Sequence, residues 1–390
     1  MQVFTESIKE LWEKSGFVNG SLLELIMLAI SLVLIYLAIA KKYEPLLLLP
    51  IAVGMLLTNI PGANMFNPAF FSGEEVNFAQ VFNQGGLLDI LYIGVKLQIF
   101  PLLIFFGVGC MTDFGPLIAN PSSFLLGAAA QAGIFLTFLG AFALGFPLNE
   151  SASIAIIGSA DGPTTIWLTT RLAPEMLGPI AIAAYSYMAL IPVIQPPVMK
   201  LLTTKKERAV RMAQLRFVSK KERIFFPIIV TVLVGFIIPD ALGLVGMLMF
   251  GNLFKESGVV DRLVKTSQNE LANIVIIMLG MAVGATAKAE NFLNGRTLMI
   301  IGLGLTAFIL STACGVLFGK LMYLFGGKKT NPLIGSAGVS ALPMAARVTQ
   351  KIGQEADPGN YLLMHAMGPT VSAIIGSAVV AGIMFSLSGV

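Results

Sequence analysis

The stretch Ile157-Gly158-Ser159-Ala160-Asp161-Gly162-Pro163-Thr164 places one acidic residue inside a segment, 151–172, that is otherwise almost uncharged and apolar. A carboxylate at membrane depth costs about 2.5 to 3.5 kcal/mol on insertion scales. Glycine and proline beside it break a helix, and a broken helix frees backbone carbonyls that must find protein, water or a cation as a partner. The segment therefore predicts a cation site at Asp161. The alternative is an aspartate that only pairs with an arginine or a backbone amide of a neighbouring helix.

The tetrapeptide Ile-Gly-Ser-Ala of this stretch returns at 334–337, inside a second run, 331–340, that again combines glycine, proline and small hydroxyl residues. One break in each half of the chain indicates an internal repeat. A third copy at 375–378 shows that the tetrapeptide also arises by chance in a glycine-rich chain. We interpret this third copy as a site of close helix packing, because small residues let two backbones approach each other.

The composition is that of a polytopic helical membrane protein. Of 390 residues, 56% are hydrophobic, 12% are charged and 40 are glycine, and several apolar runs approach the length that spans a bilayer. Cys110 and Cys314 lie in apolar runs and indicate neither a disulfide framework nor a metal motif. The sequence shows no signal peptide, no phosphate-binding loop, no Ser, His and Asp constellation and no nucleic-acid signature.

The apolar runs predict an all-α fold with about ten transmembrane helices and two glycine-broken re-entrant hairpins in an inverted repeat. We expect a first membrane repeat over 1–204 with the hairpin 151–172, a basic loop over 205–223, and a second membrane repeat over 224–390 with the hairpin 331–350. The expected spans lie near 22–40, 45–60, 87–111, 122–146, 176–201, 224–239, 241–254, 271–288, 297–325 and 361–387.

Basic residues predict the orientation in the membrane. The loop 205–223 holds eight Lys or Arg, whereas no Lys or Arg occurs between Lys42 and Lys96. The loop is therefore expected in the cytoplasm, and the two hairpins then enter from opposite faces, Asp161 from outside and Asn331 from inside. The basic loop either only fixes the topology or also forms a docking surface for an acidic cytoplasmic partner or anionic lipid headgroups.

Longer motifs carry a family resemblance. They are 158–164, Ala183-Ala184-Tyr185-Ser186-Tyr187-Met188, Ile194-Gln195-Pro196-Pro197, 201–208, 331–340, Pro343-Met344-Ala345-Ala346-Arg347-Val348 and Met364-His365-Ala366-Met367-Gly368-Pro369. With these motifs the chain resembles the membrane beta subunits of sodium-pumping biotin-dependent decarboxylases, from about residue 90 onward. The resemblance implies a cell-membrane subunit that decarboxylates carboxybiotin and couples this reaction to outward sodium transport and uptake of a proton. The implied partners are a biotin carrier protein, a carboxyltransferase subunit and a small membrane anchor subunit, within a complex that also contains further copies of this chain.

The resemblance also assigns roles to single residues. It implies sodium ligation by Asp161 and, in the second hairpin, by Asn331, Gly335 and Ser340. It places Tyr187 on the proton path and Arg347 beside the carboxylated biotin, so that Arg347, Tyr187, Asp161 and Ser340 form the implied catalytic set. The chain departs from the family at Thr370, where an asparagine is usual. Thr370 offers a hydroxyl in place of an amide carbonyl, which leaves open whether it ligates the ion or bonds its own helix backbone.

The chemistry of the residues supports these roles and leaves alternatives. Carboxylate, amide carbonyl, hydroxyl and backbone carbonyl are the oxygen donors that a hard cation takes. A guanidinium at Arg347 suits a planar carboxylate, but a helix-end arginine also reaches lipid headgroups. The Tyr187 phenol is equally consistent with an ordinary interhelical hydrogen bond, and we interpret His365 as a packing or hydrogen-bonded residue.

The sequence is also compatible with two other function classes. One is a sodium- or proton-coupled secondary transporter of an organic anion, built on the same inverted hairpins. The other is a noncatalytic membrane anchor. The sequence does not indicate which acyl substrate a decarboxylase complex would use, since that substrate is handled by the partner subunit.

Overall fold

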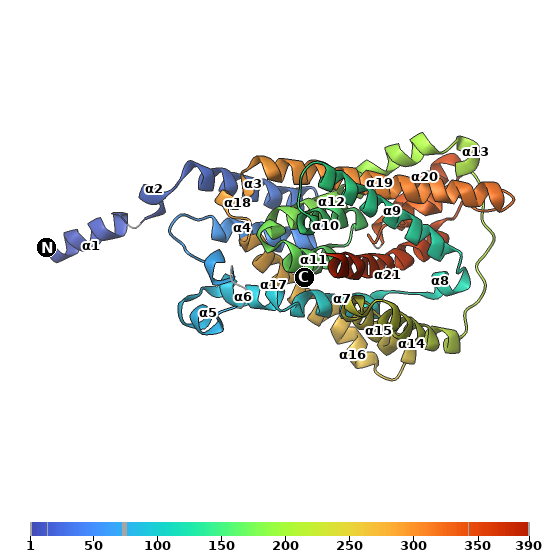
Figure 1. Cartoon of the computed structure of the whole chain (residues 1–390), viewed down its shortest axis with the longest axis horizontal. Coiled ribbons are helices and arrows are strands. Elements are labelled where there is room, and N and C mark those ends of the chain that lie inside the picture. Colours follow the sequence, from blue (N-terminus) through green and yellow to red (C-terminus); the bar gives the residue numbers. More distant parts are fainter. Residues whose placement is uncertain (1, 14, 72–75, 342, 389–390) are drawn as a thin grey trace.

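The structure is a computed structural model that describes residues 2–13, 15–71, 76–341 and 343–388. Within these ranges all regular secondary structure is helical, which confirms the prediction of an all-α fold. Most of the long helices run along the long axis of the molecule (Figure 1). Leu342, inside the expected second hairpin, lies outside the described residues.

The described residues before the basic loop form twelve α-helices. They are α1 (Gln2–Glu13), α2 (Gly16–Asn19), α3 (Leu22–Ala40), α4 (Pro45–Thr58), α5 (Phe78–Gln84), α6 (Leu87–Lys96), α7 (Ile99–Met111), α8 (Gly115–Ala119), α9 (Ser123–Ala143), α10 (Leu148–Ala155), α11 (Gly162–Leu172) and α12 (Leu177–Leu202). Short 3-10 turns cover Pro68–Phe71, Ile156–Ser159 and Pro174–Met176.

The second half continues from the basic loop to the end of the described chain. Its helices are α13 (Lys205–Arg208), α14 (Lys220–Ile237), α15 (Leu242–Ser257), α16 (Asp261–Thr266), α17 (Ala272–Ala285), α18 (Ala289–Phe292), α19 (Gly295–Phe325), α20 (Met344–Ala356) and α21 (Leu363–Leu387). Pro239–Ala241 and Pro332–Ala337 are 3-10 turns, and the π-helical turn Ser267–Leu271 joins α16 to α17.

Among the described residues, six helices are long and apolar enough to cross a membrane, which agrees with a multi-pass membrane protein. These are Leu22–Ala40, Ser123–Ala143, Pro174–Leu202, Asp261–Ala285, Gly295–Phe325 and Leu363–Leu387. A seventh span results if α6 and α7 are counted together. The expected spans 45–60, 224–239 and 241–254 are helical, but α4 and α15 have 14 and 16 residues, and α14 begins with four charged residues.

The expected span 87–111 is not one straight helix. Its two parts, α6 and α7, meet at an angle of 66°. The bend lies at Gln98, whose φ of 66° is in the left-handed region that a non-glycine residue rarely adopts. Both polar side-chain atoms of Gln98 are buried without a hydrogen-bond partner among the described residues. A backbone of this kind interrupts the helical hydrogen-bond ladder and turns the span.

Glycines bring the two halves of the chain into close contact. A Cβ atom on Gly54 of α4 would lie 2.1 Å from the Met281 carbonyl oxygen of α17. In the same way, a Cβ atom on Gly251 of α15 would lie 2.1 Å from the Phe106 carbonyl oxygen of α7. Side chains larger than hydrogen would separate these helices, as is usual where membrane helices approach closely.

The segment 209–219, between α13 and α14, has no regular secondary structure apart from the cap of α14. It runs along one end of the molecule and joins the helices on the two sides of the bundle (Figure 1). This segment forms the middle of the basic loop 205–223. A loop that lies outside the membrane must be at one end of the bundle, and the segment 209–219 is at such an end.

Candidate functional site

Both predicted glycine-rich segments are broken helices. In the first, α10 continues into a 3-10 turn that ends at Ser159. Ala160 then adopts a left-handed backbone with a φ of 53°, and Asp161 is the N-cap of α11. In the second, a 3-10 turn ends at Ala337 and α20 begins at Met344. The two breaks meet, because the backbone amide of Ser340 donates a hydrogen bond of 2.9 Å to the Ser159 carbonyl.

The Asp161 carboxylate is anchored through one of its two oxygens. Its Oδ2 accepts a hydrogen bond of 2.7 Å from the Ser377 hydroxyl of α21 and one of 2.8 Å from the Thr164 hydroxyl. Its Oδ1 receives only a long contact of 3.4 Å from the Thr164 amide at the start of α11. No arginine or lysine pairs with this carboxylate in the described part of the chain. One oxygen is therefore fixed while the other remains available.

Asp161 lines a cavity of about 290 Å³ between the two breaks and the helices α4, α7 and α17. Of the described residues, four with polar side chains line this cavity, and all four side chains carry oxygen: Glu44, Thr112, Asp161 and Ser340. Ser340 is only 8% exposed, and its hydroxyl has no hydrogen-bond partner among the described residues. A buried hydroxyl without a partner is uncommon in native proteins, so an oxygen-lined cavity with such a group is suited to a cation.

The other residues of the expected ion site lie outside the lining of this cavity. The Asn331 amide donates to the Arg208 and Val210 carbonyls at 2.9 and 2.8 Å, and its oxygen accepts from the Leu333 amide. Asn331 thus ties the second break to the basic loop. The Thr370 hydroxyl donates to the Ala337 carbonyl at 2.8 Å and to the Ala366 carbonyl of its own helix at 3.0 Å.

Gly335 is required by packing. A Cβ atom there would lie 2.0 Å from the Gly315 carbonyl oxygen of α19, and a Cβ atom on Gly315 would lie 2.1 Å from the Gly335 carbonyl oxygen. The second break therefore lies directly on α19, backbone against backbone. This contact places Gly335 and leaves its carbonyl close to α19.

Arg347 and Tyr187 lie in different surroundings. Arg347 is exposed on α20, and its guanidinium has no hydrogen-bond or ion-pair partner in the described ranges. An exposed guanidinium without a partner is free to bind an external carboxylate. The Tyr187 hydroxyl of α12, in contrast, donates to the Ile301 carbonyl of α19. His365 lines a separate cavity beside the basic loop.

Three residues near Asp161 were not predicted from the sequence. Ser377 belongs to the third Ile-Gly-Ser-Ala copy, which we had interpreted as a packing site only. Thr164 lies in the quoted stretch itself. Tyr185 is fully buried, its ring would lie 2.1 Å from a Cβ atom on Gly162, and its hydroxyl has no partner among the described residues. The repeated tetrapeptide is the one sequence signal that could have identified Ser377.

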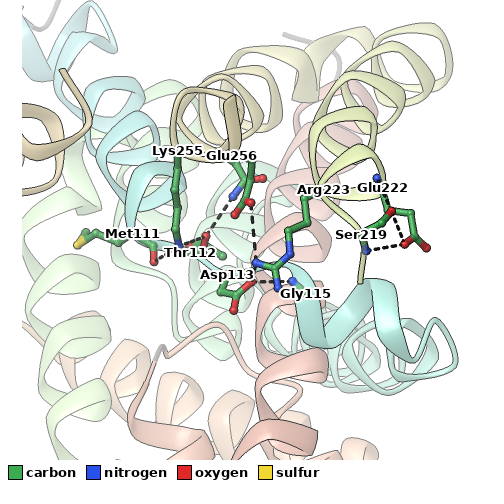
Figure 2. Close-up of polar contacts among 10 residues, drawn as sticks. Met111, Thr112, Asp113, Gly115, Ser219, Glu222, Arg223, Lys255 and Glu256 are labelled. Carbon is green, nitrogen blue, oxygen red and sulfur yellow. Dashed lines mark hydrogen bonds and ion pairs between the residues drawn. The ribbon is translucent and has the colours of Figure 1, made fainter. Parts of the chain in front are cut away.

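A second cavity, of about 580 Å³, lies where the basic loop meets α8 and the start of α21. Beside it, Arg223 of α14 lies between Asp113 and Glu256 at 3.3 and 3.8 Å (Figure 2). Lys255 donates to the carbonyls of Met111 and Thr112 at the end of α7. Since Met111 and Thr112 line the Asp161 cavity, this charged network fixes one wall of that cavity.

No group of three or more His, Cys, Asp or Glu residues that could hold a metal ion occurs in the described residues. The described polar side chains of the Asp161 cavity are two carboxylates, Glu44 and Asp161, and two hydroxyls, Thr112 and Ser340, which are oxygen donors of the kind that a hard cation takes.

Comparison with known proteins identifies the family. The chain is 56% identical to the methylmalonyl-CoA decarboxylase subunit beta of Propionigenium modestum, over 98% of this chain and the whole relative. It is 54% identical to the glutaconyl-CoA decarboxylase subunit beta of Acidaminococcus fermentans, over the full length of both. It is 50% identical to the oxaloacetate decarboxylase beta chain of Haemophilus ducreyi, over 97% of this chain and 98% of that relative. Residues 23–388 match the family model of the Na+-transporting oxaloacetate decarboxylase beta subunit, and the chain belongs to this family.

Proposed function

We propose that the chain is the membrane subunit of a sodium-pumping biotin-dependent decarboxylase. It decarboxylates carboxybiotin delivered by a biotin carrier protein, and it couples this reaction to outward sodium transport and uptake of a proton. One observation carries the proposal beyond family membership: the buried Asp161 carboxylate, held through one oxygen, faces a cavity whose polar lining consists of oxygen donors only.

Sodium would bind to the open oxygen of Asp161 and to the Ser340 hydroxyl, both of which line the cavity. Asn331, Gly335 and Thr370 remain proposed sources of further oxygens from the second break and α21. Sodium and a proton compete for one carboxylate, because a protonated aspartate is a poor cation ligand. This competition gives a physical basis for the exchange of an outward sodium ion for an inward proton.

Arg347 would hold the carboxylate of carboxybiotin. Its guanidinium is exposed and without a partner in the described chain, and its planar fork fits a carboxylate with two parallel hydrogen bonds. In decarboxylation the bond between the biotin nitrogen and the carboxyl carbon breaks, carbon dioxide leaves, and a proton replaces it on the nitrogen. We propose Tyr187 and Asp161 as groups on the path of this proton, with Ser340 beside Asp161.

The inverted repeat with about ten spans and two re-entrant hairpins is part of the proposal. Exchanging the two halves converts α4 into α15, α7 into α17, α9 into α19 and α12 into α21. Under this exchange the contact of α4 with α17 becomes the contact of α15 with α7. In the same way, the contact of α12 with α19 becomes the contact of α21 with α9. The structure contains all four of these contacts. A symmetric set of helix contacts supports repeats over 1–204 and 224–390, as in other transporters with inverted repeats.

The two hairpins begin near opposite ends of the bundle, which supports the proposed orientation. Asn331 binds the carbonyls of Arg208 and Val210 in the basic loop. Glu150, at the start of the first hairpin, pairs instead with Arg296 at the start of α19, at 3.3 Å. With the basic loop 205–223 in the cytoplasm, this loop becomes the proposed docking surface for the biotin carrier and the carboxyltransferase. A small anchor subunit and further copies of this chain complete the proposed complex.

The secondary transporter of an organic anion is disfavoured as an alternative. A binding site for an organic anion needs a cationic or donor-rich lining, and no lysine, arginine or histidine is among the described residues that line the Asp161 cavity. The family match also favours the decarboxylase subunit.

Sodium binding to Asp161→Asn tests the proposed function. We expect the variant to fold and to lose most of its sodium affinity, measured by isothermal titration on the purified full chain, because the amide carries no charge. The assembled complex should lose sodium-dependent decarboxylation in parallel. Undiminished sodium affinity of the variant would contradict the site.

A further inference from the structure

A second carboxylate lines the cavity that contains Asp161. Glu44 lies in the turn between α3 and α4, and it contributes to the same lining as Asp161 and Ser340. The remaining lining consists of apolar side chains, glycine and proline, apart from Thr112. The cavity therefore has two carboxylates on walls that come from distant parts of the chain.

The Glu44 carboxylate is not neutralised by the protein. It makes no hydrogen bond and no ion pair with any described residue, although its backbone carbonyl accepts bonds from Leu47 and Leu48. The neighbouring Lys41 and Lys42 are exposed, and neither pairs with it. A half-buried carboxylate without a partner is costly in an apolar cavity, so its charge remains available to a mobile cation.

The backbone holds Glu44 in an unfavourable conformation. Its φ of 37° and ψ of 58° lie in the left-handed region, which is rare for a residue with a side chain and disfavoured before a proline such as Pro45. Residues kept in such conformations concentrate at functional sites. Glu44 is the N-cap residue of α4, and the same residue lines the cavity.

An independent observation points to a ligand in the same cavity. The Ser340 hydroxyl, from the second break, is buried and has no partner in the described chain. The buried Tyr185 phenol, whose ring packs against Gly162, is also without a partner among the described residues. Glu44, Asp161 and Ser340 thus bring oxygen-bearing side chains to one cavity from three separate parts of the chain.

We propose that Glu44 is a second cation-binding carboxylate of this cavity, which captures a monovalent cation at the cytoplasmic side and passes it to Asp161. The proposal rests on the proposed function, because it takes the Asp161 cavity as the sodium site. It adds an entry site on the α3–α4 turn, beside Lys41 and Lys42, and the excess of lysine and arginine on cytoplasmic loops favours the cytoplasmic side for this turn. A carboxylate at an entrance raises the local cation concentration and strengthens binding at the deeper site.

Sodium titration of the full chain tests this entry site. The variants are Glu44→Gln, which removes the charge at nearly constant shape, and Glu44→Asp, which keeps it. Removal of a charge about 10 Å from the ion should weaken sodium binding by about tenfold at an effective dielectric constant near 20, and a shorter distance should weaken it further. Glu44→Asp should bind sodium more tightly than Glu44→Gln. Glu270→Gln, an exposed glutamate outside the cavity lining, is the matched control and should equal the wild type.

The melting temperature without sodium verifies that each variant is folded, and Glu44→Ala replaces the glutamine variant if that one does not fold. Equal affinities of wild type and Glu44→Gln would overturn the entry site, as would a Glu44→Asp affinity as weak as that of Glu44→Gln. Asp161→Asn is titrated in parallel. If Asp161→Asn binds sodium normally, the proposed function fails; if it loses binding while Glu44→Gln does not, only the entry site fails.

Discussion

The Ser377 hydroxyl and the Asp161 carboxylate lie 2.7 Å apart, although 216 residues separate them in the chain. The bond joins the last helix, α21, to the break in the first half. Ser377 also donates to the Ile374 carbonyl of its own helix. The contact fixes Oδ2 of Asp161, while Oδ1 has only the long contact with the Thr164 amide.

Ser377→Ala should weaken sodium binding. A hydrogen bond to a charged group contributes about 1.5 to 3 kcal/mol, and its loss makes the carboxylate easier to protonate and less well oriented. We expect a reduction of about tenfold or more in sodium affinity, measured by titration. Ser372→Ala is the control, since the Ser372 hydroxyl donates to the Phe124 carbonyl and not to Asp161. Equal affinities of the two variants would show that the contact with Ser377 does not support the ion.

Arg347→Lys should impair decarboxylation and spare sodium binding. A lysine retains the charge but lacks the planar fork that holds a carboxylate through two bonds. We expect a higher KM for free carboxybiotin together with a lower rate, and an unchanged sodium titration. Lys351→Arg, on the same helix and also exposed, controls for general effects of charge exchange on α20. Normal turnover by Arg347→Lys would contradict the binding of carboxybiotin by Arg347 and would favour a contact of this residue with lipid headgroups.

Thr370 distinguishes ion ligation from helix packing. If the hydroxyl contributes to the ion, Thr370→Asn should retain or strengthen sodium binding, whereas Thr370→Val should weaken it by about tenfold to a hundredfold, the equivalent of about 1 to 3 kcal/mol. Its bonds to the Ala337 and Ala366 carbonyls predict in addition that Thr370→Val lowers the melting temperature. Identical sodium affinities for wild type, Asn and Val variants would remove Thr370 from the ion site.

Replacement by phenylalanine should lower the stability of the protein at Tyr187 but not at Tyr185. Tyr185→Phe removes a buried hydroxyl that has no described partner, so the melting temperature should not fall. Tyr187→Phe removes the hydrogen bond from the phenol to the Ile301 carbonyl and should cost on the order of 1 kcal/mol. We expect both variants to slow sodium-dependent decarboxylation, Tyr185→Phe without loss of stability. A Tyr185→Phe variant with normal turnover would leave its hydroxyl without a function.

The contact between the basic loop and the turn after α20 should depend on pH. Arg211 binds Asp357 at 2.6 and 2.9 Å, and this pairing, with a bond from the Gly359 amide, lowers the pKa of Asp357 below its ordinary value. The stabilisation is therefore present above the pKa of the unfolded chain, about 4, and is lost as the pH falls through the lower folded value. Thermal unfolding between pH 6 and pH 3 should show a smaller loss for Asp357→Asn than for wild type. Parallel pH profiles would contradict the pairing.

The sequence predicted what depends on local chemistry. An acid beside Gly162 and Pro163 in an apolar run indicated a broken helix at Asp161, and the structure has the break there. The repeated tetrapeptide likewise located the second break. These predictions succeed because helix breaking and membrane insertion are properties of a few adjacent residues.

Residues brought in from other helices could not be predicted in this way. Ser377 donates to Asp161 because α21 packs beside α11, and Glu44 reaches the cavity because the α3–α4 turn faces it. Neither position differs locally from an ordinary helix serine or a turn glutamate. The 66° bend at Gln98 was also missed, because no glycine or proline marks a left-handed residue there.

The bond from the Ser340 amide to the Ser159 carbonyl has a consequence for mutagenesis. It involves main-chain atoms only, so every alanine replacement at either position leaves it intact. A conventional alanine scan would therefore measure only the loss of the two serine hydroxyls. It would not detect the main-chain hydrogen bond that joins the two halves. Removing the donor requires a backbone edit, such as an ester linkage at position 340, and that edit would separate the strength of the junction from the chemistry of the serine hydroxyl.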